Sequence, residues 1–332
     1  MYRSIKLSLL FLIALSVLPA NAAPPDNTAK CAGGSNCVIR IWGRIDERPT
    51  RKGTLLPQWE AGFRKLHPEI SFLHSMTGNN SAIGGLYTGA ADLAFMDREI
   101  SDMELDAFQQ GAGHGPVSFA VAVGSMGELG EASALVMVVN KNNPVRYVTV
   151  EQLKDIFGSS PTGTNQGHQW AEMGATGPWA RRPIHPYGFS VHTDESEVFD
   201  RIVLKGSERW SCSYREIPGG NNAIQAQLAK DRDGIAITTL TQLPSNLKAL
   251  PIRAENTATP TLPTKASVET RSYPLMRTLF VYVNVKPGAP MNPNVRAFVA
   301  YILGSGQESL RSMSGYRPLP ASIAQQELGK LP

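Results

Sequence analysis

The chain has 332 residues, 42% of them hydrophobic, and a formal net charge of +4. Lys and Arg are scattered along the sequence, which argues against a nucleic-acid partner. The length suits two domains of ordinary size better than one hydrophobic core.

Residues 1–22 have the features of a cleavable signal peptide. Arg3 and Lys6 precede the apolar run LSLLFLIALSVL, and Pro19–Ala22 provides an A-x-A cleavage site. The alternative is a membrane anchor, but a spanning helix needs about 20 apolar residues and this run is shorter. We therefore expect a periplasmic protein that starts near Ala23.

The three cysteines are expected to meet an oxidising compartment after export. Cys31 and Cys37 flank the Gly-rich loop CAGGSNC. This spacing predicts a small disulfide in the N-terminal segment 23–37 rather than a metal site. Cys212 is left over, and a buried free thiol is favoured over a reactive one.

From Val38 onward, short apolar strands alternate with amphipathic helices, which predicts an α/β fold with mostly parallel sheets. Trp59, Phe63 and Leu66 have helical spacing and are expected in the core. The first part of the chain is expected to contain strands at 38–42, 70–74, 92–96 and 116–124. Helices are expected at 55–67, in a segment that runs through Tyr87, and at 102–110.

The second part begins with ALVMVVNKNNPVRYVTVEQLKDIF (134–157), an apolar strand that leads through an Asn-Pro loop into a Thr-started helix. A Gly-rich hinge is expected at 124–130. Later elements are expected as helices at 194–204, 222–230, 294–303 and 307–313 and strands at 234–238 and 273–284. The return strand predicts a discontinuous lobe I, 38–126 plus 273–332, and a lobe II at 127–272.

Five blocks closely resemble the phosphate-type periplasmic solute-binding proteins of ABC transporters, in the same order and at similar spacing. They are 59–70, 89–101, 134–157, 273–284 and 306–320. The resemblance implies the type II two-lobe periplasmic-binding-protein fold, with hinge strands and an interlobe ligand cleft. It also implies a monomer that captures a tetrahedral oxyanion, with phosphate favoured, and presents it to an inner-membrane permease.

The resemblance places Asp97 at the family's ligand-facing carboxylate, which can accept a hydrogen bond from a protonated oxyanion. The alternative role, capping the next helix, is already available to Ser101 and Asp102. A family Thr before the first helix corresponds to Thr50, and Thr54 competes for this position because Thr is a common N-cap.

The family's Ser-rich loop before the second helix corresponds to a loop rich in Asn. Asn side chains can donate an amide N–H to an oxyanion, although Asn-rich loops are often plain turns. The candidates here are Asn79, Asn80 and Ser81.

The second-lobe part of the site departs from the family pattern. Family members carry an Arg shortly before Ser-Gly-Thr, whereas this chain has Thr193-Asp194-Glu195-Ser196 and no Arg between Pro186 and Asp200. Thr193 and Ser196 remain as hydroxyl candidates, with helix capping as the alternative.

Two carboxylates beside a bound dianion would lower its affinity unless they point away. Positive charge from the first lobe could compensate for them. The candidates are Arg51, Lys52 and Arg98.

An enzymatic function finds little support in the sequence. There is no G-x-S-x-G or H-E-x-x-H motif, and no carboxylate or Cys completes the His185/His192 pair as a metal site. We therefore expect no catalytic residue, metal or cofactor. The alternatives are a two-lobe sensor or adhesion-type protein that binds another ligand or none and, with less support, a hydrolase.

Overall fold

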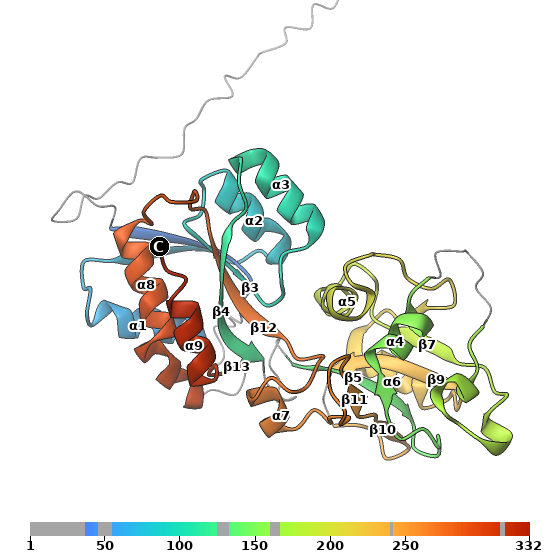
Figure 1. The fold of residues 1–332 in the computed structure, drawn as a ribbon. Helices are drawn as coiled ribbons and strands as arrows, with labels where there is room; N and C mark the ends of the chain where they lie inside the picture. The colour runs from blue at the N-terminus through green and yellow to red at the C-terminus, as the bar shows by residue number, and fades with distance from the viewer. Residues whose placement is uncertain (1–36, 46–54, 125–132, 160–166, 240–241, 313–315) are drawn as a thin grey trace, which may run out of the picture.

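The computed structural model describes residues 37–45, 55–124, 133–159, 167–239, 242–312 and 316–332. Figure 1 shows two groups of elements, each built around its own sheet. Within these described ranges no helix has the length and hydropathy needed to cross a membrane. The expected signal peptide, the 125–130 part of the hinge and residues Cys31, Thr50, Arg51, Lys52 and Thr54 lie outside them.

Lobe I is built on a six-stranded sheet with the order β13-β4-β12-β3-β1-β2. β1 pairs in parallel with β2 and β3, whereas β12 runs antiparallel to β3 and β4. The strand β12 therefore returns late in the chain and inserts between two early strands. The strands are β1 (Val38–Gly43), β2 (Ser71–Ser75), β3 (Leu93–Met96), β4 (Val117–Gly124), β12 (Thr278–Val283) and β13 (Tyr316–Arg317).

Helices cover both faces of this sheet (Figure 1). A separate cluster of buried apolar side chains lies between the sheet and the helices of each face. Trp59 and Phe63 are buried as predicted, and the Phe63 ring packs edge-on against Phe298 at 5.1 Å. The prediction for Leu66 is wrong, because α1 ends at Arg64 and Leu66 is 65% exposed. The helices are α1 (Leu55–Arg64), α8 (Pro293–Leu303) and α9 (Ala321–Leu328) on one face, and α2 (Asn79–Tyr87) and α3 (Asp102–Ala112) on the other.

Lobe II is built on a five-stranded sheet with the order β10-β5-β9-β7-β8. Both lobes have mixed sheets, so the expectation of mostly parallel sheets is wrong. The reason is that several neighbouring strands pair in antiparallel fashion. These pairs include β12 with β4 and β4 with β13 in lobe I, and β10 with β5 and β5 with β9 in lobe II. The strands are β5 (Leu135–Asn140), β7 (His185–Gly188), β8 (Arg215–Glu216), β9 (Gly234–Thr239) and β10 (Leu247–Ala249).

The helices of lobe II include α4 (Val150–Phe157), α5 (Asp194–Phe199) and α6 (Gly220–Leu228). The predicted Thr start of α4 is confirmed: Thr149 and Gln152 form a capping box that satisfies two backbone N–H groups. α5 continues through the π-helical turn Asp200–Leu204, so the predicted helix 194–204 is confirmed. A separate two-stranded sheet joins β6 (Val148–Thr149) to β11 (Ile252–Arg253).

The chain passes back from lobe II to lobe I just before β12. Tyr273 and Leu275 belong to the lobe II core, and Met276 packs against the cores of both lobes. The regular strand begins at Thr278, five residues later than predicted. This crossing places the next residue, Arg277, at the junction between the lobes.

The cysteines differ in their surroundings. Cys37 is disulfide-bonded. Its expected partner Cys31 lies outside the described residues, so the pairing stays a prediction. Cys212 is a free thiol but is exposed, so the expectation of a buried thiol is wrong. It lies in a turn between Trp210 and Tyr214, whose rings pack against the lobe II core instead.

Candidate functional site

Asp97 directly follows β3, at the carboxyl end of a strand that runs parallel to β1. Ligands of α/β sheets bind at this edge. The side chain of Asp97 is 1% exposed, and two donors hold its carboxylate. Asn79 Nδ2 lies 2.7 Å from Oδ1, and Arg277 Nη2 lies 2.5 Å from Oδ2. Asp97 is therefore a fixed, buried carboxylate at the expected ligand edge.

Arg277 is the main site residue that the sequence analysis missed. Its side chain is fully buried between the lobes, and its Nη1 donates to Glu195 Oε1 at 3.2 Å. Burial lowers the pKa of Arg277, but the charges of Asp97 and Glu195 outweigh this, so its pKa is raised above the ordinary value. The sequence did contain a signal: this Arg interrupts the apolar block YPLMRTLFVYVN, and a buried Arg needs an acidic partner.

The first turn of α5 brings two carboxylates of lobe II to this place. Asp194 Oδ1 accepts a hydrogen bond from Asn79 Nδ2 at 2.9 Å, and Arg44 forms an ion pair with the same side chain. Glu195 reaches Arg277. The condition that these carboxylates point away from the cleft is not met, because both contact donors of lobe I.

The two hydroxyl candidates on α5 make local hydrogen bonds. Thr193 is the N-cap, and its hydroxyl accepts from the Ser196 backbone N–H at 3.3 Å. The buried Ser196 hydroxyl donates to the Phe189 carbonyl at 3.3 Å. These contacts correspond to the capping alternative for Thr193, and they fix the first turn of α5 to lobe II.

Arg98 is also buried, and it joins both lobes. It donates to Glu104 at 2.8 and 2.9 Å and to Asn80 Oδ1 at 2.9 Å within lobe I. Its Nε is in ion-pair contact with Glu197 of α5 and lies 3.7 Å from Asp194 Oδ1. Burial lowers the pKa of Arg98. The hydrogen bonds and charges of Glu104 and the charges of the α5 carboxylates together raise it by a larger amount, so the pKa lies above its ordinary value.

The pKa of Glu197 is raised, whereas a carboxylate in an ordinary ion pair has a lowered pKa. Burial raises its pKa more than the charge of Arg98 lowers it, and the nearby Glu104 and Asp194 add to the increase. The carboxylate form of Glu197 is therefore disfavoured even though a cation lies beside it.

Asn79, Asn80 and Ser81 were expected in a loop, but α2 begins at Asn79, so they form its first turn and have two different roles. Asn79 and Asn80 face the charged groups described above, whereas the Ser81 hydroxyl donates to the Gly78 carbonyl at 3.0 Å and shares a hydrogen bond with Thr77. The N-cap of α2 is Gly78, which makes no side-chain cap hydrogen bond, and the first turn of this helix lies beside Asp97.

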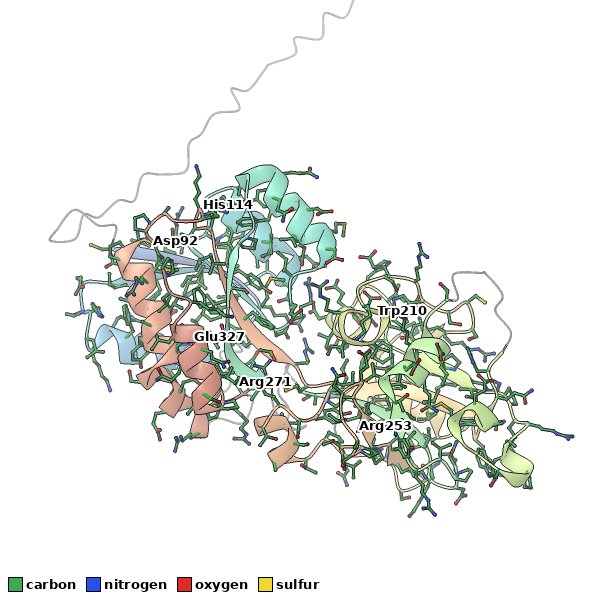
Figure 2. All side chains as sticks on the ribbon, viewed as in Figure 1. Asp92, His114, Trp210, Arg253, Arg271 and Glu327 are labelled. Atoms are coloured by element: carbon green, nitrogen blue, oxygen red, sulfur yellow. The ribbon has the colours of Figure 1, made fainter. Side chains whose placement is uncertain are left out.

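A cavity of about 580 Å³ adjoins these groups. Lobe I contributes Asp97 and Arg98 to its wall, and lobe II contributes Glu197, Trp210 and Arg271. Figure 2 shows Arg271 at the junction of the lobes and Trp210 on lobe II. Ligand pockets commonly have volumes of about 300–1,000 Å³, so the cleft can hold a small solute.

A protein-family model described as the PBP superfamily domain matches residues 49–305. The chain belongs to the PBP superfamily. Among its PBP relatives, the phosphate-binding protein PstS of Pseudomonas aeruginosa is 28% identical over 280 residues, which is 83% of each chain. Protein SphX of Synechococcus elongatus is 26% identical over 314 residues, 93% of this chain and 83% of SphX.

Two solved structures show a similar fold. An ABC-type phosphate transport receptor from Vibrio cholerae matches with a TM-score of 0.56 and 18% identity, over 85% of this chain and 100% of that one. PstS from Borrelia burgdorferi gives a TM-score of 0.56 and 15% identity, over 85% and 99% of the two chains. The predicted two-lobe fold and the resemblance to phosphate-type binding proteins are thus confirmed.

Two of the histidines in the described ranges pair with carboxylates of lobe II. His185 contacts Asp231 at 2.7 Å, and the ring of His168 contacts Glu172 at 2.6 Å. Among the residues that the structure describes, no group of three or more His, Cys, Asp or Glu side chains could hold a metal ion. The chemically distinctive place is therefore the interlobe cleft around Asp97 and Arg277.

Proposed function

We propose that this protein is an exported solute-binding protein that captures a tetrahedral oxyanion, with phosphate as the preferred ligand, between its two lobes. It delivers the anion unchanged to an ABC permease in the inner membrane. Three observations support this proposal: residues 1–22 have signal-peptide features, relatives over most of the chain are named phosphate-binding proteins, and the cleft contains oxyanion donors.

The observation that carries the proposal is the arrangement of Asp97, Asn79 and Arg277. An amide donor and a guanidinium meet at the carboxyl end of β3, next to the uncapped first turn of α2. Backbone N–H groups at a helix N-terminus and an Arg side chain are the donors that bind oxyanions in proteins. Asp97 adds an acceptor to this set of donors.

The acceptor determines which oxyanions suit the site. Hydrogen phosphate and hydrogen arsenate have a proton to donate to Asp97, whereas sulfate has none near neutral pH and would be repelled by the carboxylate. The site should therefore bind phosphate and arsenate and discriminate against sulfate and molybdate.

Isothermal titration of the mature protein with phosphate, arsenate, sulfate and molybdate tests the proposal. We expect saturable heat with phosphate and arsenate and much weaker binding of sulfate. The variant Asp97→Asn, which replaces the carboxylate by a neutral side chain of the same shape, should reduce the difference between phosphate and sulfate. No heat with any of the four anions would overturn the proposal and favour a sensor or adhesion function.

Export has its own test. Mass spectrometry of the protein recovered from the periplasm should find a chain that begins near Ala23. A chain that retains residues 1–22 in the membrane fraction would contradict the cleavage of a signal peptide.

A further inference from the structure

Carboxylates of lobe II occupy donors that an oxyanion would need. We propose that Asp194 and Glu195 act as an internal anion, which closes the cleft without a ligand and must be displaced when phosphate binds. This inference rests on the proposed function for the identity of the displacing anion. The contacts between the lobes are present whichever anion displaces the carboxylates.

Each side-chain donor that an oxyanion would use is already hydrogen-bonded to a carboxylate. Asn79 Nδ2 lies 2.7 Å from Asp97 and 2.9 Å from Asp194, so both of its hydrogens have acceptors. Arg277 divides its guanidinium between Asp97 and Glu195. A tetrahedral oxyanion bound to Asn79 and Arg277 would need the positions that these carboxylate oxygens of Asp194 and Glu195 now occupy.

The two carboxylates move as a unit with lobe II. They are consecutive residues in the first turn of α5, and the Thr193 cap and the Ser196–Phe189 hydrogen bond fix this turn to its own lobe. Their partners Asn79 and Arg277 are buried in lobe I or at its edge. Separation of the lobes would therefore withdraw both carboxylates together and free the donors.

The same contacts set the affinity of the site. A ligand that binds only the form with free donors has its apparent affinity reduced by the fraction of molecules in that form. Each carboxylate that bridges the lobes shifts the population toward the self-occupied form, because attraction between opposite charges at this distance is strengthened by partial burial. Asp194 and Glu195 thus add to the interlobe ion pairs, such as Arg98–Glu197, that favour the closed form, and they raise the phosphate concentration needed to refill the cleft.

The test compares phosphate affinity among neutralised variants. Asp194→Asn and Glu195→Gln, alone and together, remove the negative charges with little change of shape. Glu208→Gln is the matched control, because Glu208 is an acidic residue of lobe II that lines the interlobe cavity and makes no ion pair with lobe I among the described contacts. We expect the double variant to bind phosphate about tenfold or more tightly than the wild type and the control to stay within about twofold.

Small-angle scattering without phosphate provides a readout that does not depend on the ligand. The wild type should be compact, whereas the double variant should be expanded and should become compact when inorganic phosphate is added. Expansion of the double variant supports the inference even if no form of the protein binds phosphate, in which case the proposed function fails alone. Identical scattering of the two proteins without phosphate, or unchanged affinity in a phosphate-binding protein, would overturn the inference.

Discussion

Replacing Arg277 with Met should lower the free energy of unfolding by about 3–5 kcal/mol, the usual cost of removing one partner of a buried ion pair. The side chains of Arg277 and Asp97 are 0% and 1% exposed, so water cannot replace the lost partner. The hydrogen bonds to Asp97 disappear, from Nη2 to Oδ2 at 2.5 Å and from Nε to the carbonyl at 3.4 Å. The lost contact to Glu195 costs less, because that carboxylate is 23% exposed.

Urea unfolding followed by circular dichroism measures this change. For a folding unit of 150–250 residues, the predicted loss corresponds to a decrease in Tm of about 6–20 °C. Arg311→Met is the control, because Arg311 and Glu308 form an exposed pair whose removal should cost less than about 1 kcal/mol. Adding Asp97→Leu to Arg277→Met should recover much of the stability, because no isolated charge then remains buried. If Arg277→Met unfolds within about 1 kcal/mol of the wild type, the buried pair does not have the assigned role.

Other properties of the chain can be tested in the same preparations. The raised pKa of Glu197, which burial causes, means that the folded protein keeps this proton to higher pH than the unfolded chain. Stability should therefore fall as pH rises from about 4.3 through the folded pKa of Glu197. Glu197→Gln should flatten this part of a plot of urea midpoint against pH, and parallel plots for the variant and the wild type would contradict the raised pKa. Thr149→Ala removes the cap of α4 and should cost about 1 kcal/mol in urea unfolding; an unchanged midpoint would show that the cap contributes nothing. A thiol reagent should label Cys212 in the native protein and spare the disulfide-bonded Cys37, and more than one labelled thiol per chain would refute this.

Local patterns in the sequence were sufficient to predict most elements. The Thr start of α4 and the helix 194–204 are determined by nearby residues, and both appear in the structure. The exposed Leu66 was misplaced because helical spacing continues past the point where α1 ends. Local patterns could not predict the relative direction of neighbouring strands either. The antiparallel pairing of β4 with β12 depends on how the chain crosses between the lobes.

The charged network of the cleft could be predicted only in part. The resemblance to a known family pointed to Asp97, but its partner Arg277 lies 180 residues further along the chain. Asp194 is 115 residues from Asn79, and capping rules explain its place in α5 without indicating what faces it. Such pairs depend on the closure of two lobes, which no local pattern encodes.

A crystal structure of the mature protein grown with phosphate would show directly whether the anion replaces the carboxylates of lobe II. We expect a tetrahedral anion that accepts hydrogen bonds from Asn79 and Arg277 and donates one to Asp97, with the carboxylates of Asp194 and Glu195 displaced from those donors. An anion bound elsewhere, or a cleft in which Asp194 and Glu195 keep their present contacts at saturating phosphate, would contradict it.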